Sequence, residues 1–234
     1  MQIRITSISK TLGMVHTLDN ISLHVDQQEF VVILGPSGCG KSTLFNIIAG
    51  LIKPDKGQGF INDEDLTGKT GRISYMQQKD LLLPSRRVLD NVSIPLLLKG
   101  VSKQEARAQA GKYLPLFGLD EFADYYPGQL SIGMRQRAAL LRTFLFSNEI
   151  LLLDEPFASL DAITRRKMHL WLKDIQKHFH SSILFITHDI DEALFMADRI
   201  YVFSERPARI KEEIHLNSES DHAFLKENIL TLLG

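Results

Sequence analysis

An unbroken apolar run that stops at a glycine is the feature that most constrains this chain of 234 residues. The run is Phe30–Leu34, with the letters FVVIL, and Gly35 follows it directly. A continuous apolar segment of this length is typical of a strand covered on both faces of a parallel sheet. Residues 42–48 then read as a helix, so the segment predicts a buried strand, a tight turn and a helix.

The turn after this strand carries a phosphate-binding pattern, because residues 35–42 read GPSGCGKS and match G-x-x-x-x-G-K-[ST]. Glycines let backbone N–H groups curl around anionic oxygens, and the N-terminus of the next helix favours the same anion. Lys41 would attract the β- and γ-phosphates, and the Ser42 hydroxyl would bind Mg²⁺. A chance match is the alternative, but the strand and helix around the pattern are the context it requires. The predicted nucleotide-binding residues here are Gly35, Pro36, Ser37, Gly38, Cys39, Gly40, Lys41, Ser42 and Thr43.

Further apolar runs follow along the chain, at residues 150–153, 183–186 and 200–203. Between them apolar residues recur at helical spacing, as Met168 and Ile175 do. Strands that alternate with helices predict an α/β fold with a mostly parallel sheet. Since parallel strands end at the same edge of a sheet, residues after these runs are expected near the phosphate-binding turn.

The flanking segments have different patterns. Apolar and polar residues alternate near the N-terminus, which predicts an antiparallel β subdomain with half-exposed strands. Residues 88–146 show no convincing strand and predict an inserted helical subdomain. The C-terminal segment, about 205–234, contains a polar loop at 217–222 and then a short amphipathic helix. We therefore expect a single nucleotide-binding domain over residues 1–234.

Composition limits the partners and the compartment. The 27 basic and 28 acidic residues give a net charge of -1, which argues against a nucleic-acid partner bound through a broad basic surface. No apolar stretch approaches the roughly 18 residues of a membrane span. Cys39 is the single cysteine, so a reducing, cytosolic compartment is expected. Its thiol is either acidified by the nearby helix N-terminus or a small filler residue.

Two acidic residues end the apolar run at 150–153. Asp154 would lie near Mg²⁺, and Glu155, which projects differently, would polarise an attacking water as the general base. A helix N-cap is the alternative interpretation of such a pair. His188 follows the run at 183–186, so it would reach the same sheet edge and hold the γ-phosphate or orient the water.

One further segment carries a family resemblance. Residues 130–137 read LSIGMRQR and resemble the signature sequence of the ATP-binding cassette (ABC) family, and residues 159–161 resemble its D-loop. Gln78 is similar to the Q-loop glutamine, chosen over the adjacent Gln77 by its distance to the following Leu-Leu-Pro. His188 matches the switch histidine. Over essentially its whole length, the chain resembles the ATPase subunit of an ABC transporter.

This resemblance implies ATP and Mg²⁺ as ligands, ATP hydrolysis as the reaction, and a P-loop NTPase core. It implies Glu155, His188 and Gln78 as catalytic residues, and Ser42, Gln78 and Asp154 as metal ligands. It further implies that two subunits dimerise head-to-tail, so that the signature of one faces the γ-phosphate held by the other. The signature and D-loop residues that would bind nucleotide are Ser131, Gly133, Met134 and Asp161.

The resemblance also implies partners. In the family, the Q-loop and the helical subdomain pass motion to an integral membrane permease, and a solute-binding protein takes part indirectly. The chain is therefore expected at the cytoplasmic face of the cell membrane, held there by the permease. Residues 82–94 would present an apolar face for a short permease helix, unless that face is simply buried core.

Two positions depart from the family pattern. The third signature position is normally glycine but here is Ile132, whose branched side chain forbids backbone angles that glycine allows. Leu12, near Gly13, stands where an aromatic residue usually stacks on adenine. We expect Leu12 to give apolar contact with the base and little discrimination between purines.

Three short stretches point to a branch of the family. Residues 187–193 (THDIDEA), 206–210 (RPARI) and 82–84 (LLP) resemble the nitrate, sulfonate and taurine importers, and thiamine-precursor importers share them. The first hypothesis is therefore the ATPase subunit of an importer of such solutes. The alternatives are a non-transport ABC ATPase and a catalytically weakened regulatory module. An intact phosphate-binding lysine, acidic pair and switch histidine argue against the weakened module.

Overall fold

A six-stranded sheet forms the centre of the computed structural model, which describes residues 2–217 and 219–233. Neighbouring strands run parallel in the order β9-β3-β8-β7-β6, and β10 pairs antiparallel with β9 at one edge. The strands are β3 (Phe30–Leu34), β6 (Ser74–Met76), β7 (Ile150–Asp154), β8 (Ser182–Thr187), β9 (Arg199–Phe203) and β10 (Ile210–His215). All residues of β3, β7, β8 and β9 are buried. The predicted α/β fold with a mostly parallel sheet is confirmed.

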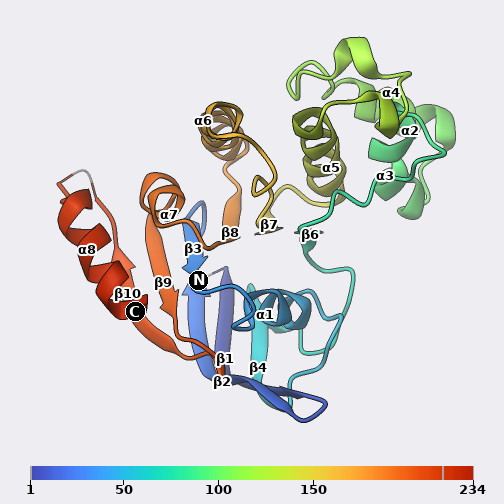
Figure 1. Cartoon of the computed structure of the whole chain (residues 1–234). Helices are drawn as coiled ribbons and strands as arrows, with labels where there is room; N and C mark the ends of the chain where they lie inside the picture. The colour runs from blue at the N-terminus through green and yellow to red at the C-terminus, as the bar shows by residue number, and fades with distance from the viewer. Residues whose placement is uncertain (1, 218, 234) are drawn as a thin grey trace.

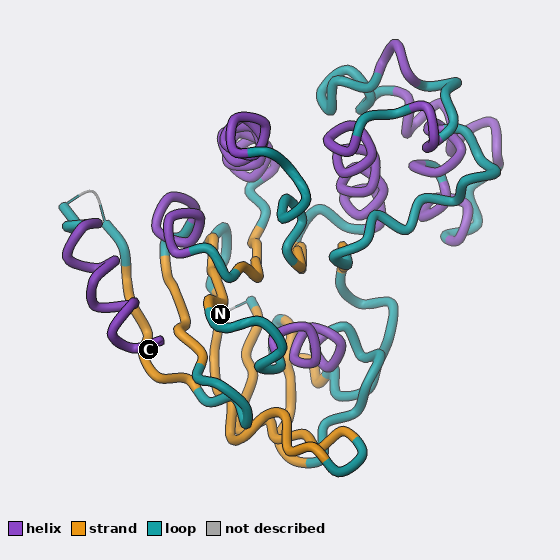
Figure 2. Tube along the Cα trace, in the orientation of Figure 1, coloured by secondary structure: helices purple, strands orange, loops and turns teal. Residues whose placement is uncertain are grey.

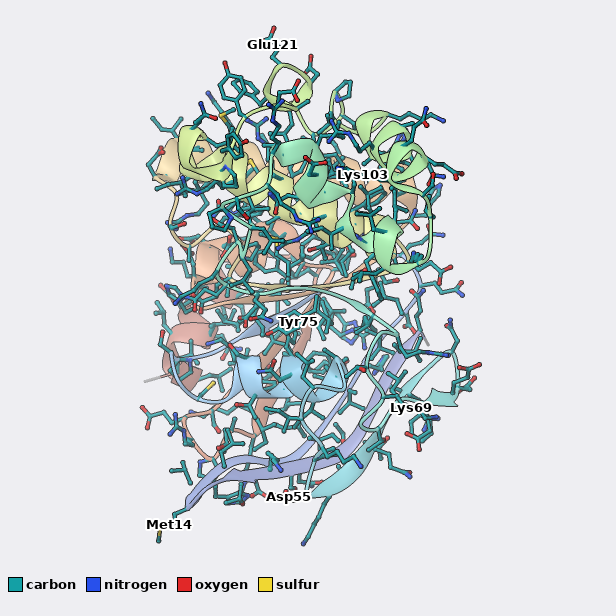
Figure 3. All side chains as sticks on the ribbon, turned by 90° about the vertical axis from the view of Figure 1, so that its right-hand side faces the viewer. Met14, Asp55, Lys69, Tyr75, Lys103 and Glu121 are labelled. Carbon is teal, nitrogen blue, oxygen red and sulfur yellow. The ribbon has the colours of Figure 1, made fainter. Side chains whose placement is uncertain are left out.

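A second, antiparallel sheet carries the N-terminus, in the order β2-β1-β4-β5 (Figure 1). Its strands are β1 (Ile3–Leu12), β2 (Val15–Val25), β4 (Lys56–Ile61) and β5 (Glu64–Asp65). Together with α1 (Lys41–Ile48), this sheet packs apolar side chains against Val31 and Ile33 of β3. The tip of the β1–β2 hairpin extends away from the core, and Met14 is fully exposed there (Figure 3).

Two helices cover the other face of the parallel sheet. They are α6 (Ala162–Phe179) and α7 (Ile190–Met196). Met168, Leu172 and Ile175 recur at helical spacing on α6 and belong to the same buried cluster as Phe30 and Val32 of β3. The parallel sheet is therefore covered on both faces, which explains why its strands are continuous apolar runs.

Helices make up most of the chain between β6 and β7 and lie to one side of the two sheets, in contact with β6 (Figure 2). They are α2 (Val88–Val92), α3 (Ile94–Leu98), α4 (Lys103–Gly111) and α5 (Ile132–Phe146), with single turns at Asp120–Phe122 and Pro127–Gln129. We call them the helical lobe. Aromatic rings join this lobe to α6: the centroids of Phe117 and Trp171 lie 5.1 Å apart, and those of Phe144 and Phe179 lie 4.3 Å apart. These contacts fix the lobe to the α/β core.

The C-terminal segment lies along the edge of the six-stranded sheet. After β10, helix α8 (His222–Leu233) packs beside α7 and β9 and buries Ile229 (Figure 1). The short helix predicted here has formed, while residue 218 of the predicted polar loop lies outside the described residues. None of the described helices is both long and apolar enough to cross a bilayer.

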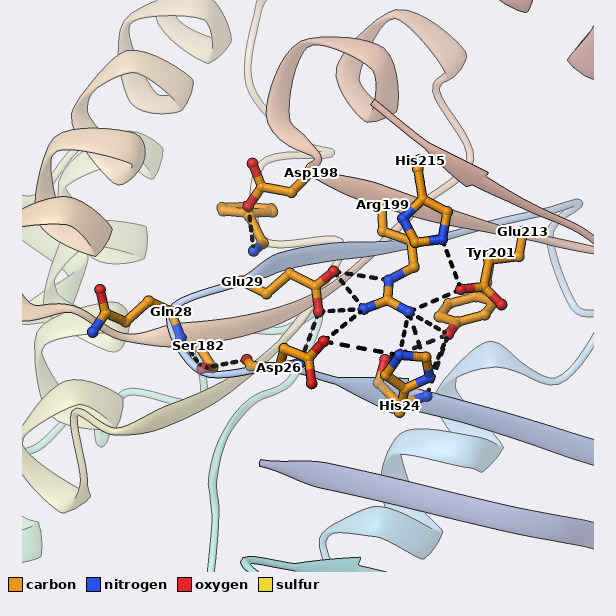
Figure 4. Close-up of polar contacts among 11 residues, drawn as sticks. His24, Asp26, Gln28, Glu29, Ser182, Asp198, Arg199, Tyr201, Glu213 and His215 are labelled. Atoms are coloured by element: carbon orange, nitrogen blue, oxygen red, sulfur yellow. Dashed lines mark hydrogen bonds and ion pairs between the residues drawn. The ribbon is translucent and has the colours of Figure 1, made fainter. Parts of the chain in front are cut away.

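A buried arginine ties the two sheets together (Figure 4). Arg199 on β9 is 3% exposed, and its guanidinium donates to the Glu29 carboxylate oxygens at 2.8 and 2.7 Å and to Glu213 Oε1 at 2.8 Å. It also contacts the His24 ring of β2. Burial disfavours the charge of Arg199, but the carboxylates outweigh burial and raise its pKa. One side chain thus joins β2, β9 and β10.

Candidate functional site

The turn between β3 and α1 has a shape that requires glycine at two positions. Gly40 has a φ of 131°, and a Cβ atom there would lie 2.9 Å from Leu18 of β2. A Cβ atom on Gly35 would lie 2.9 Å from the Cβ atom of Phe203 on β9. Side chains are excluded because neighbouring strands approach the turn closely. The turn leads directly into the N-terminus of α1, an arrangement that suits a phosphate group.

Lys41 is held inside this turn. Its side chain is 5% exposed, and Nζ donates to the carbonyl oxygens of Gly35 at 2.7 Å and Pro36 at 2.9 Å. These carbonyl dipoles orient the ammonium group without cancelling its charge. The amine is therefore placed to attract phosphate oxygens, as the sequence predicts.

Ser42 and Asp154 meet where β7 ends. The Ser42 hydroxyl lies close enough to Asp154 to lower the pKa of that carboxyl group, and the Tyr75 hydroxyl donates to Asp154 Oδ2 at 3.2 Å. Burial raises the pKa of Asp154 against these hydrogen bonds, and burial also raises the pKa of Tyr75, which stays a neutral donor. Hydroxyl and carboxylate oxygens are ligands that Mg²⁺ prefers.

This donor set fits a magnesium ion that completes its shell with phosphate oxygens and water. Such a site uses one or two protein carboxylates rather than a full protein cage. Across the described residues, no group of three or more His, Cys, Asp or Glu side chains is arranged to hold a metal ion. A site built on Ser42 and Asp154 requires none.

Glu155 lies beside His188 and Gln78, as the strand-edge argument predicts. His188 Nδ1 is 3.2 Å from Glu155 Oε2, and Gln78 Nε2 donates to the same oxygen at 3.5 Å. The Glu155 side chain is 14% exposed and the His188 side chain 51% exposed, so the pair joins the buried edge to solvent. Glu155 has a φ of 45° and lines the pocket described below, whereas Asp154 does not. The adjacent Gln77 lines a different hollow.

A buried network supports the histidine from behind. The Thr187 hydroxyl donates to the Glu192 carboxylate, whose Oε1 atom lies 2.6 Å from His169 Nε2 on α6. His169 and Glu192 are 5% and 9% exposed. Asp189 accepts from the N–H of Glu192 at 3.1 Å and caps α7. These contacts hold the backbone on both sides of His188, whose ring contacts Glu155.

The β1–β2 hairpin, the glycine turn with the start of α1, and residues that follow β6, β7 and β9 surround a pocket of about 450 Å³. Its lining includes nine of the predicted residues, namely Leu12, Ser37, Gly38, Gly40, Lys41, Ser42, Thr43, Gln78 and Glu155. Its volume and its mixture of apolar and charged walls suit a small polar ligand. Gly35, Pro36 and Cys39 belong to the turn but do not line the pocket.

Cys39 is a filler residue. Its side chain is 2% exposed among apolar side chains of the core, and burial raises the pKa of its thiol despite the nearby Lys41. The alternative interpretation, a thiol acidified at a helix N-terminus, is therefore wrong.

The signature and D-loop residues lie elsewhere. Ser131 caps α5 by accepting from the N–H of Met134 at 3.3 Å, and Asp161 caps α6 by accepting from the N–H of Thr164 at 3.0 Å. Gly133 is buried near Thr164. None of Ser131, Gly133, Met134 and Asp161 lines the pocket.

Ile132 occupies the first position of α5 and is not among the described residues with positive φ. The isoleucine therefore fits the backbone that this position adopts, and the expected restriction on backbone angles does not arise. Its side chain is 46% exposed and lines a second hollow of about 500 Å³, which Gln78 also lines. The departure from glycine changes the surface of this hollow rather than the fold.

Three pocket residues were not predicted from the sequence as binding residues: Val15, Thr17 and Arg206. Arg206 follows β9, which runs parallel to β3 and ends at the same edge. The argument that places His188 therefore applies equally to residues after Phe203, and that signal was available. Val15 and Thr17 come from the hairpin, whose approach to the turn is a long-range contact that periodicity does not reveal.

The model of the ABC transporter family matches residues 18–158. The formylaminopyrimidine import ATP-binding protein ThiZ of Halalkalibacterium halodurans is 42% identical over 92% of this chain and 89% of its own length. The nitrate import protein NrtD of Synechocystis is 40% identical over 94% and 85%, and the taurine import protein TauB of Pseudomonas aeruginosa is 44% identical over 84% and 75%.

Solved structures show the same relationship. A dimeric bacterial ABC transporter cassette superimposes with a TM-score of 0.80 at 32% identity, over 92% of this chain and 99% of that one. A post-hydrolysis state of the same cassette, bound to ADP and Pi, matches equally well. The chain thus belongs to the ABC transporter family, as one of its ATP-binding and ATP-hydrolysing subunits.

Proposed function

We propose that this chain powers the uptake of a small solute through a separate membrane permease. The observation that carries its ATPase part is that Lys41 and Glu155 line one pocket, with the His188 ring 3.2 Å from the Glu155 carboxylate. The relatives named above serve the import of nitrate, taurine or formylaminopyrimidine, and their similarity spans most of this chain. We therefore assign the solute to these classes of small polar molecules.

Within the pocket, the backbone of the glycine turn and Lys41 bind the β- and γ-phosphates. Ser42, Asp154 and the side-chain oxygen of Gln78 would hold Mg²⁺, which would neutralise charge on the phosphate oxygens. Because Asp154 is buried, its carboxylate meets the ion in a setting where attraction is weakly screened by water.

Glu155 acts as the general base in this proposal. Its carboxylate accepts a proton from the attacking water, and the neighbouring Gln78 amide helps to place that water. His188, 3.2 Å from Glu155 Oε2, contacts the γ-phosphate from the other side. The network of Thr187, Glu192 and His169 holds the backbone next to His188.

A second copy of the chain completes each site. Ser131, Gly133 and Met134 at the N-terminus of α5, together with Asp161, face the nucleotide bound by the partner copy. ATP then stabilises the closed dimer because it binds that state more tightly, and hydrolysis releases it. The dimeric state of the related cassette supports this arrangement.

An apolar groove of about 360 Å³ is our proposed docking surface for the permease. It runs along the helical lobe beside the end of α1, and its exposed residues include Leu98 and Leu51, at 80% and 54% exposure. Within the expected face at residues 82–94, Leu82, Val88 and Val92 are buried. The docking surface therefore shifts to the groove, where Ile94 and Pro95 contribute.

This assignment places the chain at the cytoplasmic face of the membrane, bound through the permease, with a solute-binding protein acting on the far side. We group its segments as one nucleotide-binding domain, with the helical lobe at about 88–146 and the C-terminal segment at about 205–234. The lobe then carries the signature and one wall of the docking groove, so it links the ATP site to the permease.

The test is co-expression with the permease encoded beside its gene. We expect the wild-type chain to co-purify with that permease and to support ATP-dependent uptake of taurine, nitrate or formylaminopyrimidine into vesicles. Leu98→Glu should abolish both properties while ATP binding persists, because a charge cannot enter an apolar contact without a partner. Leu230→Glu, at an exposed apolar site on α8, is the matched control. Normal coupling by Leu98→Glu would disprove the docking surface.

A further inference from the structure

Arg206 is a cation at the nucleotide pocket to which the phosphate-binding chemistry described above gives no role. It is exposed, and it lines the pocket opposite the catalytic edge, with the hairpin residues Leu12, Val15 and Thr17. Among the described residues no carboxylate forms an ion pair with it, whereas Arg209 of the same loop pairs with an aspartate of β2. A planar cation is thus available to a ligand in the pocket.

The contact between Arg206 and the phosphate-binding turn defines its position. Its Nε atom donates to the carbonyl oxygen of Gly38 at 3.1 Å, and Nη2 donates to the same oxygen. In a trans peptide the C=O and N–H groups point in opposite directions. The N–H of that peptide, on Cys39, points back toward the Pro36 carbonyl at 3.4 Å. The guanidinium therefore lies on the outer side of the turn, away from the inward N–H groups that face phosphate.

The loop of Arg206 is also joined to the hairpin wall. The N–H of Ala208 donates to the Thr17 carbonyl at 2.9 Å, and the N–H of Asp19 donates to the Ala208 carbonyl at 3.0 Å. Leu12 is half-exposed on the same wall, at 40%. This side of the pocket therefore combines apolar surface with a guanidinium, and no described residue that lines the pocket is aromatic.

We propose that Arg206 binds the base-and-ribose half of the nucleotide, with its guanidinium plane against the purine. A guanidinium stacks on aromatic faces and is attracted by their π electrons. Leu12 and Val15 supply the apolar surface around the base. The hydrogen bond to Gly38 holds the guanidinium in place before the nucleotide arrives, which reduces the entropy lost on binding.

The experiment distinguishes contacts with the purine base from contacts with the phosphates. Dissociation constants of the purified chain for ATP and for inorganic tripolyphosphate are measured by calorimetry, for wild type, Arg206→Ala, Arg206→Lys and Arg209→Ala. We expect Arg206→Ala to weaken ATP binding about tenfold and to leave tripolyphosphate binding unchanged. Arg206→Lys should also weaken ATP binding, because an ammonium group lacks the plane that stacks. Arg209→Ala, in the same loop, should bind ATP like wild type.

The proposal depends on the ATP-binding function, and the controls keep the two apart. Equal weakening of ATP and tripolyphosphate by Arg206→Ala would mean that Arg206 acts through the phosphate-binding turn, and would overturn the proposal. Unchanged ATP affinity in Arg206→Ala, or an equal loss in Arg209→Ala, would overturn it too. Failure of the wild-type chain to bind ATP would contradict the ATP-binding function itself. Thermal unfolding of each variant confirms that the fold is intact.

Discussion

The phosphate-binding pocket and the start of α5 differ in how much of a site one chain provides. The pocket gathers side chains from the hairpin, from the turn after β3, and from residues that follow β6, β7 and β9. The start of α5 offers a capped helix N-terminus and adds no side chain to that pocket. One region is a nearly complete nucleotide site, and the other is a contact surface.

Sheet topology explains the difference. Parallel strands end at one edge, so residues distant in sequence meet there within a single chain. The signature instead belongs to the helical lobe, which aromatic contacts hold to α6, and none of its residues lines the pocket. Binding is therefore a property of one copy, and on our proposal hydrolysis requires two. Three experiments test this division, from the largest expected effect to the smallest.

Removing the general base, Glu155, should stop ATP hydrolysis at the nucleotide pocket without loss of ATP binding. We expect Glu155→Gln to slow ATP turnover about 10²–10⁴-fold, because a neutral amide cannot accept the proton. ATP affinity should persist, and a stable dimer should appear in size-exclusion chromatography with ATP. Glu149→Gln is the control, because Glu149 precedes the first residue of β7 at the end opposite Glu155. This variant should keep normal turnover. Full activity of Glu155→Gln would remove this residue as the base.

Mixing two inactive variants tests whether the two regions act across copies. Ser131→Glu places a charge where the second nucleotide would approach, and Lys41→Ala removes the phosphate-binding cation. Each variant alone should lose ATP turnover, by about a hundredfold or more, since one charged contact to phosphate is lost or opposed. Mixed dimers contain one intact pocket facing one intact signature, so the mixture should recover part of the activity.

The same variants differ in binding when measured singly. Ser131→Glu should bind ATP as wild type does in the monomer, whereas Lys41→Ala should bind it weakly. Unrecovered activity in the mixture, despite folded variants and a normal wild-type assay, would mean that the signature does not serve the partner's pocket. Weak ATP binding by monomeric Ser131→Glu would place the signature in its own pocket instead.

Substitution of Ile132 is expected to change ATP turnover least among the three experiments. Its exposed side chain would desolvate the approaching phosphates at a cost of about 1 kcal/mol, so Ile132→Gly should raise turnover about fivefold. Since the backbone of Ile132 does not have a positive φ, Ile132→Ala should give most of the same gain. Steady-state rates at saturating ATP measure both. A gain with glycine but none with alanine would show that backbone freedom, rather than side-chain bulk, limits the rate.

Much of the fold was predictable from local sequence. The runs at Phe30–Leu34 and Ile150–Asp154 contain the apolar residues that two-sided burial demands, and the glycine turn between strand and helix is a local pattern. The positions of Glu155 and His188 at the sheet edge were predictable for the same reason, because each residue directly follows a buried strand. A single rule about parallel strand ends then brought them together.

Other features depend on contacts between distant segments. Arg206 and Val15 reach the pocket from opposite ends of the chain, and no periodic pattern links them. Leu82 and Cys39 are buried because segments distant in sequence cover them. Both residues lie in loops or turns, where no periodic pattern indicates which side chains will be buried. The salt bridges of Arg199 are equally invisible in the sequence, because its partner Glu29 is 170 positions away.

That separation has a consequence for how the protein is made. β3 has β8 and β9 as its neighbours in the sheet, so it stays unpaired on the ribosome until residues near the end of the chain have been synthesised. The N–H of Phe30 awaits Asp198, 168 positions later, and the Glu29 carboxylate awaits Arg199. Assembly of long-range pairs is slow, and it leaves an apolar strand exposed in the meantime. The nucleotide pocket therefore forms only after β8 and β9 have been synthesised and have paired with β3.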